Sequence, residues 1–251
     1  MSGKKSRLDQ RLVKEGLAQS RGRAQAMIMS GKVLVNQRPV DKPGAQIFDD
    51  DRVVLKGEDF PYVSRGGLKL AAALAEFEIQ LSGFICLDVG ASTGGFTDCL
   101  LQNGAEHVFA VDVGYGQLAW PLRQDPRVTV LERTNIRHMD SDRLPRPVDL
   151  ATIDVSFISL KIVVPAVMKF MKPEARIIAL IKPQFEVGKG QVGKGGVVKD
   201  ADLHEAVIRS LSAFFSDTGL GVGPVVPSPV LGPKGNREFL ILLKKSYSPG
   251  F

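Results

Sequence analysis

Short apolar runs alternate with segments of helical periodicity over most of the chain beyond residue 64. Continuous apolar runs of about four to eight residues, bounded by turns, are typical of buried strands. Such runs fall at residues 84–87, 107–111, 128–131, 150–153, 177–181 and 238–245. Helical segments are expected at residues 96–101, 160–170 and 201–215. Strands that alternate with helices predict an α/β fold with a parallel sheet.

The pattern before residue 60 predicts a separate, small α+β unit. Leu8 and Leu12 recur at helical spacing, and Ser20 is placed to cap a second helix. Short strands are expected at residues 33–35 and 52–56, with a turn between them.

Pro61 and the polar residues before it mark a break between the two patterns. We expect a small domain at residues 1–59, a linker at 60–63 and a large domain at 64–251. The large domain opens with a helix whose apolar stripe is predicted to be Leu68, Ala71, Ala72 and Leu74.

A glycine-rich turn follows the first strand of the large domain. Gly90, Gly94 and Gly95 lie between the run at 84–87 and the next helical segment. Strand, glycine turn and helix in this order form the first half of a Rossmann-like nucleotide-binding unit. Asp112 ends the next strand, roughly 20 residues beyond the turn, where an acid can bind ribose hydroxyls.

The composition of the turn favours S-adenosylmethionine over NAD as the cofactor. Ala91, Ser92 and Thr93 separate the first two glycines, which departs from the phosphate-binding fingerprint. Asp88 at the strand end would repel a pyrophosphate, whereas S-adenosylmethionine carries an ammonium and a sulfonium. We predict that Asp88, Gly90, Ser92, Gly94 and Asp112 bind this cofactor.

Four polar residues follow apolar runs directly, and we expect them to converge. Asp88, Asp112, Asp154 and Lys182 each end a predicted strand. Ligands of such sheets bind beyond the carboxyl ends of the strands. This position alone marks Asp154 and Lys182 as candidates for catalysis.

Positive charge points to a nucleic-acid partner. The chain has a formal net charge of +6 and a pI near 9.3, and basic residues are concentrated on the first two predicted helices. Such a face is typical of binding to a phosphate backbone. The residues that we expect to contact RNA there are Arg7, Arg11, Arg21 and Arg23.

A glycine-rich basic loop lies between residues 183 and 200. It matches a phosphate loop formally, but Gly195 replaces the Ser or Thr that would hold magnesium, and no helix follows at once. Two interpretations stay open: a loop that closes over RNA through Lys189 and Lys194, or an ordinary surface loop.

Other classes of protein find little support. Cys86 and Cys99 lie in apolar segments and are expected to be buried fillers. Scattered histidines and cysteines predict no metal site. No apolar run reaches the roughly 20 residues of a membrane helix, and the basic start has no apolar segment of a signal peptide. We therefore expect a cytoplasmic protein; the oligomeric state is left open.

Two sets of motifs resemble known families. Residues 6–56, from "RLDQRLVKEGLAQSRGRAQAMIMSGKVLVN", are similar to the RNA-binding domain named after the fourth small-subunit ribosomal protein, and Arg7, Arg21 and Arg23 fall at its basic positions. The motifs "SRGGLKL", "LDVGASTGGF", "DVSFISL", "IKPQFE" and "GNREFL" resemble the TlyA family of bacterial ribosomal RNA 2′-O-methyltransferases, sometimes labelled haemolysins, with an FtsJ-type catalytic part.

The resemblance implies a catalytic tetrad of Lys69, Asp154, Lys182 and Glu238. Lys69 and Glu238 are indicated by the resemblance alone. The implied reaction is attack of a ribose 2′-oxygen of cytidine on the sulfonium methyl group. A hydroxyl is a poor nucleophile and needs a base or strict orientation; Lys182 is our candidate for this role, and no metal is required.

Two alternatives remain. A non-catalytic RNA-binding factor for ribosome assembly would keep the fold without turnover, and methyl transfer into ribosomal RNA separates it from the enzyme. A membrane-active haemolysin is suggested by the family label, and dye leakage from liposomes would reveal it.

Overall fold

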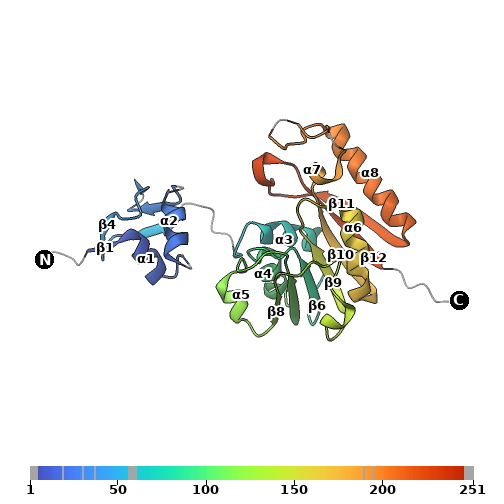
Figure 1. Ribbon diagram of the computed structural model, residues 1–251, viewed down its shortest axis with the longest axis horizontal. Coiled ribbons are helices and arrows are strands. Elements are labelled where there is room, and N and C mark those ends of the chain that lie inside the picture. Colours follow the sequence, from blue (N-terminus) through green and yellow to red (C-terminus); the bar gives the residue numbers. More distant parts are fainter. Residues whose placement is uncertain are drawn as a thin grey trace. The chain divides into compact units, whose positions relative to one another are not determined.

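The computed structural model describes residues 5–18, 20–29, 31–36, 38–55, 61–188, 190–193 and 195–245. The chain divides into two compact units, a small unit at Met1–Asp59 and a large unit at Phe60–Phe251 (Figure 1). Of the predicted linker, residue 60 lies outside the described residues. Residues 61–63 belong to the large unit, because the Val63 N–H donates to Asp98 Oδ2 at 2.7 Å and Gln102 donates to the Pro61 carbonyl at 2.8 Å.

The small unit packs two helices on short strands. Its elements are β1 (Lys5–Arg7), α1 (Leu8–Lys14), α2 (Arg21–Met29), β2 (Val33–Val35), β3 (Arg38–Pro39), β4 (Gln46–Phe48) and β5 (Val53–Leu55). The strands form a pair, β1-β4, and a three-stranded sheet, β3-β2-β5. Its core contains Leu8, Leu12, Ala24 and Ile28. The Ser20 hydroxyl accepts from the Arg23 N–H at 3.2 Å, so the predicted cap is confirmed.

The small unit also corrects two expectations. Arg38 and Pro39 form the strand β3 where a turn was predicted. The strands β1 and β4 were not predicted, since each is three residues long and neither has an apolar run.

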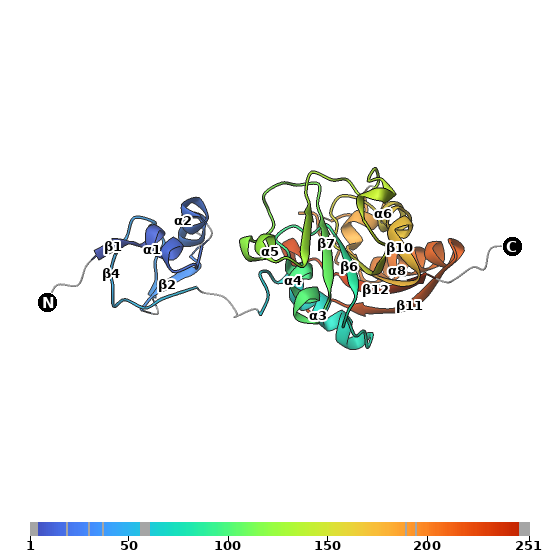
Figure 2. The same ribbon diagram turned by 90° about the horizontal axis from the view of Figure 1, so that it is seen from below.

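The large unit has three layers, with a seven-stranded sheet between helices (Figures 1 and 2). Its strands are β6 (Ile85–Val89), β7 (His107–Val111), β8 (Val128–Leu131), β9 (Val148–Ile153), β10 (Met171–Ile181), β11 (Leu220–Pro227) and β12 (Phe239–Lys245). They lie in the order β11-β12-β10-β9-β6-β7-β8. This is the predicted Rossmann-like α/β class.

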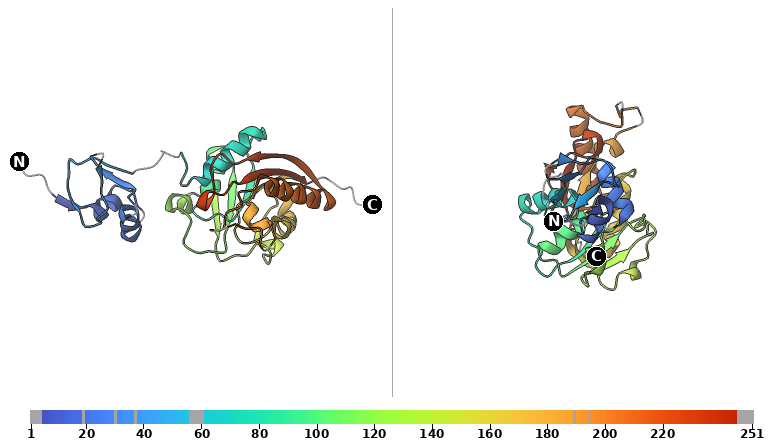
Figure 3. Two further views of the ribbon diagram at one scale, coloured as in Figure 1. Left: turned by 90° about the horizontal axis from the view of Figure 1, so that it is seen from above. Right: turned by 90° about the vertical axis from the view of Figure 1, so that its left-hand side faces the viewer.

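Helices cover both faces of this sheet. On one face lie α3 (Gly66–Glu76), α4 (Gly95–Gln102) and α5 (Trp120–Gln124), and on the other α6 (Leu160–Val167) and α8 (Ala201–Asp217). Short helical segments are η1 (Ser141–Arg143), η2 (Met168–Phe170), α7 (Pro183–Glu186) and η3 (Pro233–Gly235). Helix α8 packs beside β11 (Figure 3). Among the described residues, none of the helices has both the length and the apolar character needed to cross a membrane.

The direction of β12 differs from the expectation of a parallel sheet. Both β10 and β11 pair with β12 in antiparallel register, whereas β6, β7, β8, β9 and β10 pair with one another in parallel register. The amino end of β12 therefore lies at the edge where the parallel strands have their carboxyl ends. Glu238, directly before Phe239, is brought to that edge.

The predicted apolar stripe of α3 is right only at Leu74. The buried apolar residues are Leu70, Ala73 and Leu74, while Leu68, Ala71 and Ala72 are only partly buried. Lys69 lies on the buried side of the helix, with 8% of its surface exposed. The helix thus presents a lysine to the interior.

Candidate functional site

A cavity of about 420 Å³ lies at the carboxyl ends of the parallel strands, a volume within the usual range for small-molecule sites. The glycine turn, the start of α3 and the loop before β12 surround it. Its lining includes Ser64, Arg65, Lys69, Gly90, Ser92, Thr93, Asp154, Lys182, Leu231, Gly232 and Glu238. All four residues of the predicted tetrad therefore face one cavity.

The first lysine–carboxylate pair joins α3 to the start of β12. The Lys69 amine donates to Glu238 Oε2 at 2.6 Å, and their side chains are 10% and 0% exposed. Glu238 Oε1 is buried without a hydrogen-bond partner. A Cβ added to Gly232 would lie 2.0 Å from this oxygen, so the backbone there packs directly on the carboxylate.

The second pair joins the ends of two adjacent strands. Lys182 follows β10 and Asp154 follows β9, and these strands pair in parallel. The Lys182 amine lies 2.6 Å from Asp154 Oδ1 and donates to Ser156 Oγ at 3.1 Å. The site thus contains two lysine–carboxylate pairs with no net charge between them.

Helix α7 ties the segment after Lys182 to the loop after Asp154. The Glu186 carboxylate accepts from Ser159 Oγ at 2.6 Å and from the Leu160 N–H at 2.8 Å, at the start of α6. Burial raises the pKa of Glu186. The loop between Asp154 and α6 also carries Phe157, which has a φ of 64° and is 89% exposed.

The glycine turn keeps bare backbone beside the cavity. Gly90 and Gly94 have φ values of 86° and 97°, which favour glycine. A Cβ at Gly90 would lie 2.4 Å from the Asp154 carbonyl oxygen, and one at Gly94 would lie 2.3 Å from Leu122. Only glycine lets the turn pack this closely against its neighbours.

Asp88, one of the predicted cofactor contacts, is not among the residues that line the cavity. It is fully buried, and its carboxyl oxygens accept from the Thr97 hydroxyl at 2.7 Å and the Thr152 hydroxyl at 3.1 Å. Burial raises the pKa of Asp88 to about 7. A position at a strand end does not determine which way the side chain points, and Asp88 points inward.

Asp112 is not among the lining residues of the cavity, but it bonds Ser92, which is. Its carboxylate accepts from the Ser92 N–H at 2.7 Å and from the Gly114 N–H at 2.6 Å. Ser92 lines the cavity with a φ of 49°. Asp112 is partly exposed, and each of its oxygens has a lone pair left for a ligand hydroxyl.

The predicted RNA contacts in the small unit differ in their surroundings. Arg7 and Arg21 both bond the buried Asp9, while Arg11 pairs with Glu15 and Asp49. Arg23 is exposed on α2. Lys189 and Lys194 lie outside the described residues.

Several lining residues were missed by sequence reasoning. Ser64 and Arg65 precede α3 and were considered only as part of a motif, and Leu231 and Gly232 lie in an irregular loop without periodicity. Tertiary packing alone brings these segments to the cavity. The free thiols Cys86 and Cys99 are buried, as expected.

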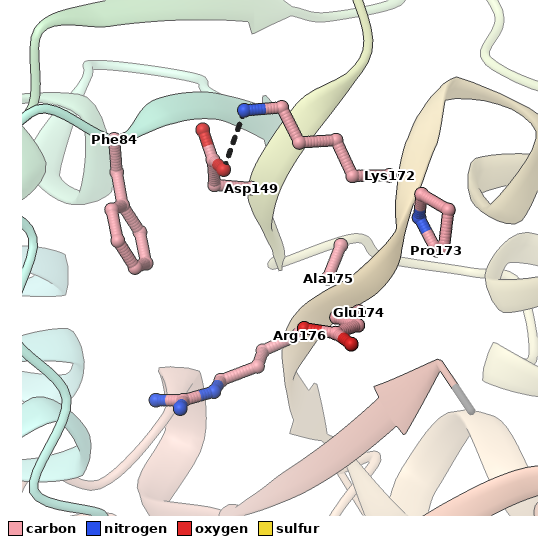
Figure 4. A pocket seen from close by; sticks show the side chains of 7 residues that line it. All are labelled: Phe84, Asp149, Lys172, Pro173, Glu174, Ala175 and Arg176. Carbon is pink, nitrogen blue, oxygen red and sulfur yellow. Dashed lines mark hydrogen bonds and ion pairs between the residues drawn. The ribbon is translucent and has the colours of Figure 1, made fainter. Parts of the chain in front are cut away.

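A second cavity, of about 500 Å³, lies near the amino ends of the parallel strands, whereas the first lies at their carboxyl ends (Figure 4). Phe84, the Lys172–Asp149 ion pair of 2.7 Å and Arg176 surround it, near the amino ends of β6, β9 and β10. None of the predicted site residues lines it. The chemistry expected from the sequence therefore belongs to the first cavity.

Comparison with known proteins matches both units. FtsJ-like methyltransferases match residues 62–245, and the S4 domain matches residues 6–53. YqxC of Bacillus subtilis, provisionally named an rRNA methyltransferase, is 48% identical over 97% of this chain and 87% of its own. The 16S/23S rRNA (cytidine-2′-O)-methyltransferase TlyA of Mycobacterium tuberculosis is 47% identical over 96% of this chain and 90% of its own. A Streptococcus thermophilus structure, provisionally described as a hemolysin, has 45% identity and a TM-score of 0.76, covering 99% of this chain and 91% of its own.

Proposed function

The chain belongs to the FtsJ-like methyltransferase family and carries an S4 domain, and from this premise we propose that it methylates a ribose 2′-hydroxyl of ribosomal RNA with S-adenosylmethionine. One observation supports this most directly: two lysine–carboxylate pairs face one cavity beside a glycine turn. We further propose cytidine as the target nucleoside, because the TlyA relative is named for this specificity. Ribosomal subunits as substrates place the protein in the cytoplasm.

The residues of the cavity fit S-adenosylmethionine. When bound, it supplies a methyl group that an oxygen nucleophile can attack. Gly90, Ser92 and Thr93 line the cavity, whose volume of about 420 Å³ leaves room for a ligand beside the strand ends. Asp112 is our candidate for binding the ribose hydroxyls. The carboxylates of Asp154 and Glu238 also line the cavity, each paired with a lysine, so a cationic ligand meets no net positive charge from these two pairs.

We assign the Lys182–Asp154 pair to the nucleophile. The Lys182 amine is placed to hold the 2′-oxygen of the RNA ribose, and Asp154 Oδ1, 2.6 Å from this amine, is our proposed acceptor for the hydroxyl proton. The Lys69–Glu238 pair lines the same cavity, and in this proposal it orients the ribose. Correct alignment of the oxygen with the methyl carbon can itself supply much of the acceleration.

The small unit supplies affinity for RNA in this proposal. Lysine and arginine contacts with phosphates give binding that depends on salt and little on sequence, while the large unit performs the chemistry. Arg7, Arg21 and Arg23 are the proposed contacts.

The test uses the purified full chain with methyl-labelled S-adenosylmethionine and isolated small or large ribosomal subunits. We expect label in RNA at a discrete ribose, located by reverse-transcription stops at 2′-O-methyl positions. Protein-free rRNA serves as a second substrate, to show whether the assembled subunit is needed. An absence of label from protein that binds the cofactor would overturn the proposal in favour of a non-catalytic role.

A further inference from the structure

Asp9 is a fully buried carboxylate in the first turn of α1, and the cofactor site makes no use of it. The Arg7 guanidinium binds it in a bidentate manner, with Nε 3.0 Å from Oδ1 and Nη2 3.0 Å from Oδ2. Arg21 Nε donates to Oδ2 at 3.0 Å, and Gln25 Nε2 donates to it at 3.1 Å. Hydrogen bonds from the Arg7 guanidinium hold the pKa of Asp9 well below its usual range.

The two arginines use only part of their hydrogen-bonding capacity on Asp9. A guanidinium has five N–H donors, and Asp9 takes two nitrogens of Arg7 and one of Arg21. Arg7 Nη1 and both Nη atoms of Arg21 have no partner among the described residues. The side chains remain 38% and 55% exposed, so these donors can reach a ligand.

The cluster has spare positive charge in a fixed arrangement. Two guanidinium groups share one carboxylate, which leaves a net charge of +1. The Arg7 guanidinium lies close to Gly44, where an added Cβ would be 3.3 Å from Nη1. Arg11 is the contrast: Glu15 and Asp49 both pair with it, and its side chain is 14% exposed.

We propose that Asp9 is a positioning residue that joins Arg7 and Arg21 into one preorganised site for a backbone phosphate of RNA. This inference rests on the proposed function. Asp9 does not touch the RNA; it holds both side chains in place before binding, which removes most of the conformational entropy that free arginines would lose. Paired guanidinium donors also suit the geometry of phosphate oxygens.

A charged site and a positioned site predict different results. If only charge matters, Arg21→Lys retains binding, and Asp9→Asn, which removes a negative charge, does not weaken it. If Asp9 positions the pair, Arg21→Lys loses nearly as much as Arg21→Ala, because lysine has no planar fork. In addition, Arg21→Ala costs much less in an Asp9→Asn background.

The experiment measures the dissociation constant of the full chain for isolated ribosomal subunits at several salt concentrations. We expect Asp9→Asn to weaken binding about tenfold, within the range for losing an arginine–phosphate contact, and to lower the salt slope by about one contact. Glu15→Gln is the matched control, since it removes a carboxylate from Arg11 and is expected to leave affinity within about twofold. Unchanged affinity in Asp9→Asn, or losses that multiply with Arg21→Ala, would overturn the inference.

Two further measurements keep the result decisive. Thermal unfolding shows whether Asp9→Asn folds; if it does not, the Arg7→Ala and Arg21→Ala cycle replaces it. If both arginines bind one phosphate, the second substitution should weaken RNA binding by less than about threefold. If they bind independently, the two losses of affinity multiply. Methyl transfer by the unsubstituted protein tests the proposed function separately, so turnover with unchanged Asp9→Asn affinity would refute this inference alone.

Discussion

Lys69 and Glu238 lie 169 positions apart in the chain, yet the Lys69 amine is 2.6 Å from Glu238 Oε2 inside the large unit. Neither residue follows the carboxyl end of a parallel strand, as Asp154 and Lys182 do. Lys69 is on the buried side of α3. Glu238 precedes β12, whose amino end lies beside the carboxyl ends of the parallel strands. The pair therefore depends on the whole topology.

Glu238→Gln should abolish methyl transfer, with a loss of at least about 100-fold. The substitution keeps the shape of the side chain but leaves the Lys69 ammonium buried without its counter-charge. Breaking a buried pair in this way costs roughly 3–5 kcal/mol of folding stability. Single-turnover methyl transfer and thermal unfolding measure the two effects. Glu174→Gln, at an exposed glutamate of the second cavity, is the control and should retain both properties.

The double variant Lys69→Met with Glu238→Gln separates stability from chemistry. Removal of both charges relieves the unpaired ammonium, so thermal stability should recover relative to Glu238→Gln. Activity should stay lost. Recovery of turnover in the double variant would show that the pair only supports the fold.

Gly232→Ala tests the packing of backbone against the same carboxylate. The added Cβ would lie 2.0 Å from Glu238 Oε1, so the glutamate must move away from Lys69. We expect roughly 1–3 kcal/mol of destabilisation, typical of overpacking, together with a large loss of turnover. Gly188→Ala is the matched control, because its nearest atom would be 3.5 Å away. Equal turnover in both variants would contradict the assignment.

Lys182→Ala should abolish methyl transfer and leave S-adenosylmethionine binding nearly intact. Its amine faces Asp154 and Ser156, where we place the ribose oxygen. The cofactor is proposed to bind beside the turn at Gly90 to Gly94, so it does not depend on this amine. Equilibrium dialysis with labelled cofactor and methyl transfer into ribosomal subunits measure the two properties on one protein sample. Lys182→Arg keeps the charge but changes the geometry and should also be inactive. Turnover in Lys182→Ala would refute the proposed role.

The sequence predicted what depends on local pattern. The strands β7 and β8 match the predicted ranges, and Asp154 and Lys182 were recognised because they end apolar runs on neighbouring strands. The glycine turn lies where strand, turn and helix predicted it. Each of these signals is contained within a few consecutive residues.

The local sequence pattern predicts neither the direction of a strand in the sheet nor the direction in which a side chain points. An apolar run has the same composition in either direction, so the antiparallel β12 and the position of Glu238 were not foreseen from spacing. The strand β11, with the sequence LGVGPVVP, was missed because its glycines and prolines indicate turns. In the stripe of α3 only Leu74 was predicted correctly, so the burial of Lys69 beside Leu70 was not foreseen.

The inward direction of the Asp88 side chain was likewise not predicted. Its burial leads to a prediction about how stability depends on pH. Its pKa is raised to about 7 by burial, against about 3.9 for an exposed aspartate. Between these two values the folded protein keeps the proton while the unfolded chain loses it. The free energy of unfolding therefore falls as pH rises through this window, by up to about 1.4 kcal/mol per pH unit, and levels off above about pH 7.

Asp88→Asn should remove this contribution, because the amide stays neutral and can still bond the Thr97 and Thr152 hydroxyls. Urea unfolding at pH 5 and pH 8 measures the effect as the difference between the two proteins, which cancels the other titrating groups. The variant should gain more stability relative to the unsubstituted protein at pH 8 than at pH 5, because most of the window between about pH 3.9 and pH 7 lies above pH 5. Asp217→Asn, at an exposed aspartate ending α8, is the control and should show no such change. Parallel pH curves for the Asp88→Asn variant and the unsubstituted protein would mean that the buried carboxyl is ionised across the whole range, and its two threonine hydroxyls would then have to offset the cost of burying a charge.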